Sequence, residues 1–122
     1  MFELDITKSF SAAHELSNYN GPCANLHGHN WNVQVFVMAE NLNEIGIALD
    51  FRKLKAELGR ILERYDHHCL NDLPEFKNEN PTSENIAKHI YHELSDLLNQ
   101  PGLRVSKVRV CESDSSGAAY WC

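Results

Sequence analysis

The sequence contains no run of 18 or more apolar residues, so it lacks a segment that could form a transmembrane helix. Basic residues are also scarce, because 11 Lys and Arg against 17 Asp and Glu give a formal net charge of −6. A nucleic-acid binder needs a basic face to displace counterions from phosphates, so this charge argues against such a partner. The first residues also lack the basic and then apolar pattern of a secretory signal, so we expect a cytosolic protein.

The chain lacks repeats, low-complexity tracts and linker-like stretches, which indicates one domain over residues 1–122. No two cysteines are spaced as C-x-x-C. In a cytosolic protein cysteines stay reduced, so a special cysteine would be a catalyst or a metal ligand. The four cysteines are Cys23, Cys69, Cys111 and Cys122, of which the last three are expected to be small packing residues.

Hydrophobic periodicity predicts an α+β fold. Two stretches alternate apolar and polar residues, as half-buried strands do, and two longer stretches repeat apolar residues at helical spacing. Two strand pairs separated by two helices predict a four-stranded antiparallel sheet with both helices on one face. The expected elements are strands over residues 1–14 and 27–38, helices over 50–65 and 81–98, and strands over 104–111 and 118–122.

Each predicted helix has one apolar stripe that should face the sheet. The first helix begins at the capping residue Asp50, and the second begins within Pro81-Thr82-Ser83-Glu84. His89 and His92 fall outside the second stripe, so we expect them on a solvated face. The stripes are Phe51, Leu54, Leu58, Ile61, Leu62 and Tyr65, and then Ile86, Ile90, Leu94, Leu97 and Leu98.

Three histidines share the inward parity of the first two strands. His14 ends the first strand, and His27 and His29 begin the second, two residues apart and on the same side. An antiparallel pair of strands can therefore bring all three rings together. Three neutral imidazoles leave a zinc ion with an open fourth position, as in catalytic zinc sites. The pattern predicts a zinc site.

Cys23 lies four residues before His27 in a turn-rich segment. It could be a fourth zinc ligand, which would close the site. It could instead be a thiol that faces the substrate, since a nearby cation increases the thiolate population. The spacing leaves both alternatives open.

Two further features are typical of acid–base and ring-binding groups. Asp66 precedes His67, and a carboxylate beside an imidazole can fix its tautomer in a proton relay. Glu112 ends an inward-facing stripe, where it could accept two hydrogen bonds from the amino-amide edge of a pterin or guanine. Taken singly, Asp66 could also be a helix-end acid and Glu112 a strand-end acid.

Together these residues resemble the 6-pyruvoyl-tetrahydropterin synthase family, and within it the bacterial branch of 6-carboxy-tetrahydropterin synthases. The resemblance implies a tunnelling fold, in which trimers close a twelve-stranded barrel and two trimers stack into a hexamer. It covers essentially the whole chain. The motifs that carry it are Phe10-Ser-Ala-Ala-His14, Cys23-x-x-x-His27-Gly-His29-Asn30, Asp66-His67-His68, Pro81-Thr82-Ser83-Glu84-Asn85 and Glu112-Ser113.

The resemblance also implies roles for single residues, at a site built between subunits. Zinc would be held by His14, His27 and His29. Proton transfer would fall to Cys23, Asp66 and His67. The pterin ring would be anchored by Glu112 and held by groups around Thr82 and Ser83.

The reaction implied is conversion of 7,8-dihydroneopterin triphosphate to 6-carboxy-5,6,7,8-tetrahydropterin, acetaldehyde and triphosphate, in queuosine biosynthesis. This choice of branch depends on the three residues between Cys23 and His27. A resemblance to the animal pyruvoyl-forming enzymes would imply a longer loop at this position. Two alternatives remain. One is 6-pyruvoyl-tetrahydropterin synthase activity, which stops at triphosphate elimination. The other is a structural zinc module without catalysis.

Overall fold

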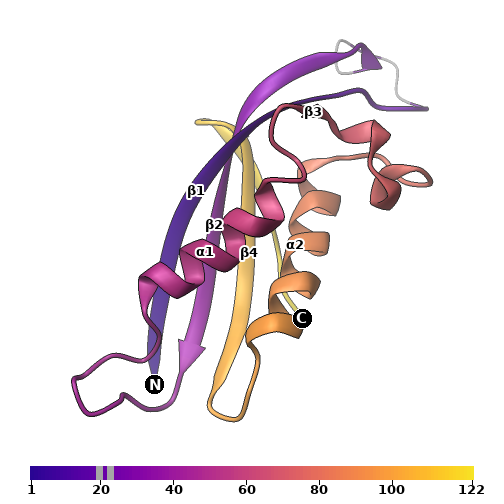
Figure 1. Ribbon diagram of the computed structural model, residues 1–122. Helices are drawn as coiled ribbons and strands as arrows, with labels where there is room; N and C mark the ends of the chain where they lie inside the picture. The colour runs from indigo at the N-terminus through magenta and orange to yellow at the C-terminus, as the bar shows by residue number, and fades with distance from the viewer. Residues whose placement is uncertain (19–20, 22–23) are drawn as a thin grey trace.

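The computed structural model describes residues 1–18, 21 and 24–122 (Figure 1). Five strands form one sheet, in the spatial order β3-β1-β2-β4-β5. The elements in chain order are β1 (Phe2–His14), β2 (His27–Ala39), α1 (Phe51–Leu62), β3 (His68–Cys69), the short 3-10 helices η2 (Leu70–Asp72) and η3 (Pro74–Phe76), α2 (Ser83–Leu98), β4 (Leu103–Ser113) and β5 (Ser116–Tyr120).

The antiparallel pair β1 and β2 is the centre of the sheet. The two strands pair over their full length, from Phe2 opposite Ala39 to His14 opposite His27. The alternation in the sequence has its expected result, because from Trp31 onward one face of β2 is buried and the other is partly or fully exposed. The buried residues of β2 include Trp31, Val33, Val35 and Val37.

The sheet differs from the four-stranded antiparallel prediction by one strand. β3 has only two residues and pairs parallel to β1, with His68 opposite Ala12 and Cys69 opposite Ala13. A two-residue strand is too short for a period-two pattern, so the sequence carries no signal for it. The sheet is therefore mixed, and the prediction of a purely antiparallel sheet is wrong.

Both helices cover the same face of the sheet, as predicted (Figure 1). The side chain of Asp50 caps α1 by accepting from the Arg52 amide, and Thr82 caps α2 by accepting from the Asn85 amide. Helix α1 ends at Leu62, three residues earlier than predicted, because the chain turns sharply there. Tyr65 is nevertheless fully buried.

Two members of the predicted apolar stripes lie outside the core. Phe51, the first residue of α1, and Leu97, near the end of α2, are each 53% exposed. The remaining stripe residues are buried against the sheet, as the helical spacing requires. None of the helices in the described part of the chain is long and apolar enough to cross a membrane.

Candidate metal centre

The three predicted ligand histidines meet at one end of the central strand pair. His14 lies opposite His27 in the ladder, and His29 lies opposite Ala12 on the same face of the sheet. The Nε2 atoms of His14 and His27 are 3.1 Å apart, and one ligand nitrogen from each of the three rings lies within 4.8 Å of the others. This spacing would let the three nitrogens bind one metal ion.

Backbone carbonyls orient two of the rings. Nδ1 of His14 donates to the carbonyl of Pro81 at 2.8 Å, and Nδ1 of His27 donates to the carbonyl of Asn25 at 2.6 Å. A hydrogen bond from the far ring nitrogen fixes the tautomer and leaves Nε2 free to bind a metal. Nε2 of His29 is buried without a hydrogen-bond partner among the described residues. An orphaned buried nitrogen beside two oriented imidazoles fits a metal ion.

His14 lies deepest in the cluster. It is 2% exposed, and burial is the main cause that lowers its pKa, with the neighbouring imidazoles acting in the same direction. A neutral imidazole is the form that binds metal. The ring of Trp31 lies edge-on to His14 and His29, at 4.9 and 5.2 Å between centroids. The indole therefore forms the floor of the cluster.

Glu112 brings the only carboxylate that contacts this cluster within the described part of the chain. Its Oε2 atom lies 3.6 Å from Nε2 of His29 and 4.0 Å from Nε2 of His14. The side chain is 34% exposed, so it can also be reached from solvent. Because β4 has a bulge between Cys111 and Ser113, Glu112 is an extra residue in the β4–β5 ladder. Bulges commonly redirect a side chain next to a functional site.

The second predicted group, Asp66 and His67, lies on the outer edge of β1. Oδ2 of Asp66 is 2.8 Å from Nδ1 of His67, and Oδ1 accepts from the Ser11 amide at 2.8 Å. The Ser11 carbonyl accepts from the His67 amide, which holds His67 in the left-handed region at φ 59°. The hydrogen bonds from Ser11 and then His67 lower the pKa of Asp66. The pair is therefore an ionised carboxylate holding an exposed imidazole.

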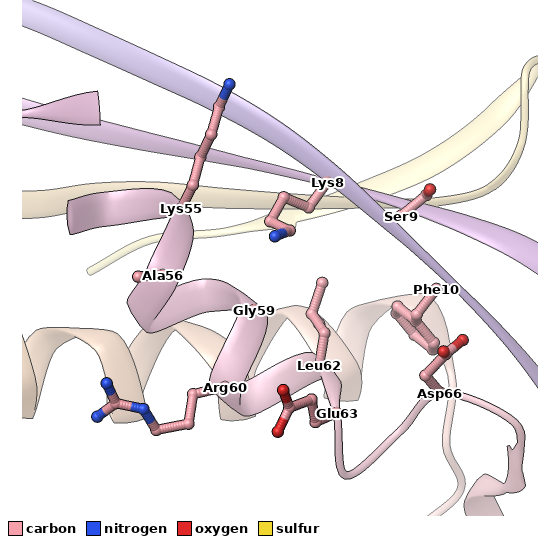
Figure 2. Close-up of a pocket in the computed structure, with 10 residues that line it drawn as sticks. All are labelled: Lys8, Ser9, Phe10, Lys55, Ala56, Gly59, Arg60, Leu62, Glu63 and Asp66. Carbon is pink, nitrogen blue, oxygen red and sulfur yellow. The ribbon is translucent and has the colours of Figure 1, made fainter. Parts of the chain in front are cut away.

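A groove between β1 and α1 leads to this pair (Figure 2). It has a volume of about 450 Å³, and Asp66 lies in its wall. Figure 2 shows Lys8 reaching from β1 toward α1. A Cβ atom at residue 59 would lie 3.0 Å from Nζ of Lys8, so Gly59 leaves room for the ammonium group. Three cations line the groove, Lys8, Lys55 and Arg60, together with the acids Glu63 and Asp66.

The structure does not join all the predicted site residues within one chain. No hydrogen bond or ion pair of the described residues links the Asp66–His67 pair to the three histidines. Thr82 and Ser83 directly follow the carbonyl that orients His14, but the Thr82 hydroxyl already accepts the capping hydrogen bond. Cys23 lies outside the described residues.

Other titratable residues match the sequence predictions less closely. His92 is exposed, as expected, but His89 is half-buried and paired with Glu79, so its placement on a solvated face is wrong. The cysteines at 69, 111 and 122 are free thiols, and Cys122 is exposed rather than packed. Sequence reasoning missed the Pro81 carbonyl and the Ser11 backbone, because backbone groups carry no residue-type signal.

A mixed sheet covered by two helices, with a cluster of three histidines at one end that could hold a metal ion, defines an α+β fold with a candidate metal centre. The model of the 6-pyruvoyl tetrahydropterin synthase family matches residues 3–122. The chain belongs to this family, and the resemblance inferred from the motifs is confirmed.

Relatives in the family carry the name that the motifs implied. The chain is 39% identical to the 6-carboxy-5,6,7,8-tetrahydropterin synthase of Synechocystis, over 93% of this chain and 88% of the relative. It is 33% identical to the enzyme of that name from Bacillus subtilis, over 98% of this chain and 84% of the relative. The solved structure of the 6-pyruvoyl tetrahydropterin synthase of Caenorhabditis elegans matches with a TM-score of 0.86 and 29% identity. The match covers 99% of this chain and 95% of that chain. These matches confirm the predicted fold and the family.

Proposed function

We propose that this protein is a zinc-dependent 6-carboxy-5,6,7,8-tetrahydropterin synthase, a lyase of queuosine biosynthesis. The observation that carries the proposal is the cluster of three imidazoles, whose ligand nitrogens lie within 4.8 Å of one another at the end of the β1–β2 pair. The names of the bacterial relatives favour the carboxy-forming reaction over other chemistry of the family.

The proposed reaction adds water to 7,8-dihydroneopterin triphosphate and gives 6-carboxy-5,6,7,8-tetrahydropterin, acetaldehyde and triphosphate. His14, His27 and His29 would hold the zinc ion. When bound, the ion would supply Lewis-acid polarisation of the side-chain oxygens of the substrate. Glu112, partly exposed beside the cluster, would accept two hydrogen bonds from the amino-amide edge of the pterin ring. Thr82 and Ser83, at the start of α2, would help to hold the ring.

Proton transfer is assigned to Cys23, Asp66 and His67. The ionised Asp66 holds the His67 ring through Nδ1, so Nε2 of His67 is free to take a proton from the substrate or return one. Cys23 would exchange the second proton as a thiol. The cations of the groove beside Asp66 could bind the triphosphate.

The 6-pyruvoyl-tetrahydropterin synthase reaction is a second candidate, favoured by the match to the Caenorhabditis elegans structure. Incubation of zinc-loaded protein with dihydroneopterin triphosphate and mass spectrometry of the products separates the two. Acetaldehyde and a carboxylated pterin are the expected products, whereas a diketo side chain would assign the pyruvoyl reaction. Absence of any turnover would favour a structural zinc module.

Association of subunits is the remaining part of the proposal. Within the described chain, β1 is paired on its outer side only at Ala12 and Ala13, next to Asp66 and His67. Unpaired strand edges favour pairing with another chain. A neighbouring copy at this edge would bring its metal cluster to the acid–base pair, within a hexamer of two trimers. No nucleic acid or membrane partner is proposed.

The free edge can be blocked without disturbing the β1–β2 pair. Thr7 has the same parity as Ser11, whose amide and carbonyl point away from β2, so the Thr7 amide also points outward. Thr7→Pro removes that donor. We expect a folded variant that sediments as a smaller species, binds zinc and loses turnover, whereas Thr7→Val keeps the assembly. A fully assembled, active Thr7→Pro variant would contradict the proposed site between subunits.

A further inference from the structure

We propose that Asn80 is a positioning residue of the metal centre: its side-chain amide ties the loop that carries the Pro81 carbonyl to the chain segment that carries His14. The inference rests on the proposed metal site and extends it to a residue outside the cluster of histidines. It can be tested on the metal-free protein, so the proposed metal site and the proposed role of Asn80 can fail separately.

The side chain of Asn80 forms the pair of hydrogen bonds that a neighbouring strand would form. Its Oδ1 atom accepts from the Ser17 amide at 2.9 Å, and its Nδ2 atom donates to the Ser17 carbonyl at 3.0 Å. The Ser17 hydroxyl donates to the same Oδ1 atom at 3.0 Å. Ser17 lies beyond His14, the last residue of β1. The Asn80 amide therefore holds the continuation of β1 in place of a strand.

The next residue of the loop, Pro81, holds the His14 ring. Its carbonyl accepts from Nδ1 of His14 at 2.8 Å, and both residues are buried. The carbonyl of Asn80 accepts from Nδ2 of Asn85 at 2.8 Å, which ties the loop to the first turn of α2. The loop therefore contacts the end of β1 at two points, the ring of His14 and the backbone of Ser17.

Two points of attachment restrict a metal ligand more than one does. A single hydrogen bond would let the ring and the carbonyl move together, because the carbonyl belongs to a loop without regular structure. The bonds of Asn80 oppose this movement, since they hold the loop against the backbone from which the His14 side chain extends. Nε2 of His14 then stays 3.1 Å from Nε2 of His27. Metal affinity should therefore depend on an amide that is bonded to Ser17.

Asn71 offers a matched comparison in the same chain. Its Oδ1 atom accepts from the Glu15 amide at 2.9 Å, and its Nδ2 atom donates to the Glu15 carbonyl at 2.9 Å. This pair of bonds holds the same segment and has the same chemistry. As far as the structure describes the chain, the Asn71 side chain forms no hydrogen bond to the loop before α2. Loss of the Asn71 amide should therefore lower stability without releasing the Pro81 carbonyl.

Zinc affinity separates a positioning role from a general effect on stability. Chelator competition is measured for the wild type, Asn80→Ala and Asn71→Ala, with thermal melts of the metal-free proteins. We expect Asn80→Ala to bind zinc about tenfold more weakly, the lower end of the effect of losing an outer-shell partner. Asn71→Ala should melt at a similarly lowered temperature and bind zinc as the wild type does. Equal zinc affinities of the two variants would overturn the proposal.

A conservative variant provides the test if Asn80→Ala does not fold. Asn80→Asp keeps an acceptor for the amide and hydroxyl of Ser17 and loses only the donor to the Ser17 carbonyl. We expect it to fold and to bind zinc with an affinity between those of the wild type and Asn80→Ala. Wild-type zinc affinity in Asn80→Asp and in every folded Asn80 variant would contradict the positioning role.

The His14 ring can also be observed without metal. Its Nδ1 proton is buried and donated to the Pro81 carbonyl, so it should exchange slowly with water and give an NMR signal that His14→Ala lacks. We expect this signal in the wild type and Asn71→Ala, and its loss through faster exchange in Asn80→Ala. A signal that persists in Asn80→Ala would overturn the proposal. A wild type that shows the signal but binds no zinc would refute the proposed metal site and leave the role of Asn80 toward His14 intact.

Discussion

Trp31→Phe is expected to weaken both the fold and the metal site. Trp31 is fully buried, and its indole Nε1 donates to the Ala12 carbonyl at 3.1 Å. Phenylalanine keeps an aromatic ring but removes this hydrogen bond, whose net contribution is about 0.5–1.5 kcal/mol, because the Ala12 carbonyl keeps its ladder partner opposite His29. The smaller ring forfeits packing worth a further ~1 kcal/mol. The free energy of unfolding should therefore fall by about 1.5–2.5 kcal/mol.

The same substitution should lower zinc affinity. The indole lies edge-on to His14 and His29 and so restricts both rings. Loss of groups that orient ligands typically lowers metal affinity about 10–100-fold, and we expect an effect near the lower end because a ring remains at this position.

Urea denaturation of the metal-free protein and chelator competition measure the two effects, at one fixed protein concentration. Trp121→Phe is the matched control, because Trp121 is 62% exposed and is the only other tryptophan. It should change stability by less than about 0.5 kcal/mol. It also leaves Trp31 as the sole indole, whose fluorescence should respond to zinc. Wild-type stability or wild-type zinc affinity in Trp31→Phe would refute the role of the indole as the floor of the cluster.

Three further predictions follow from the site and the sheet. His14→Ala should abolish stoichiometric zinc binding and His92→Ala should retain it; full zinc content in the first variant would reject the cluster as the metal site. Because the folded protein lowers the pKa of Asp66, this carboxylate contributes stability that is complete above about pH 4 and is lost as the pH falls through the lower folded-state value. Asp66→Asn should therefore flatten the dependence of the melting temperature on pH below about pH 4. An unchanged pH profile would argue against a stabilising contribution of the ionised Asp66. Gly117→Ala should lower the melting temperature, since its Cβ would overlap the Cys111 sulfur; an unchanged temperature would mean that the sulfur moves freely.

The metal cluster could be predicted from the sequence because strand parity is a strict constraint. His14, His27 and His29 share the parity of buried residues on two strands that pair over their whole length, so a shift of one residue would have separated them. The prediction needed only the period of the strands and the direction of the pairing. The convergence of the three rings in the structure agrees with it.

The acid–base pair could be recognised but not placed. The residues Asp66 and His67 are adjacent in sequence, but their docking on Ser11 depends on a two-residue strand and on one left-handed residue. Neither has a periodic pattern, and a left-handed histidine is uncommon enough that local preference does not predict it. The end of the first helix was also misjudged, because the turns after Leu62 depend on backbone hydrogen bonds rather than on side-chain spacing.

The placement of these two groups separates metal binding from proton transfer. The histidines lie on the two central strands and are oriented by carbonyls of the same chain, so zinc affinity should not depend on protein concentration. The Asp66–His67 pair lies on an edge that lacks a neighbour along most of β1 in the described chain, so its substrate-facing position would depend on a second copy. Dilution below the dissociation constant of the assembly should therefore abolish turnover while the zinc stays bound. Parallel loss of zinc and turnover on dilution would instead mean that the metal cluster itself is completed by another subunit.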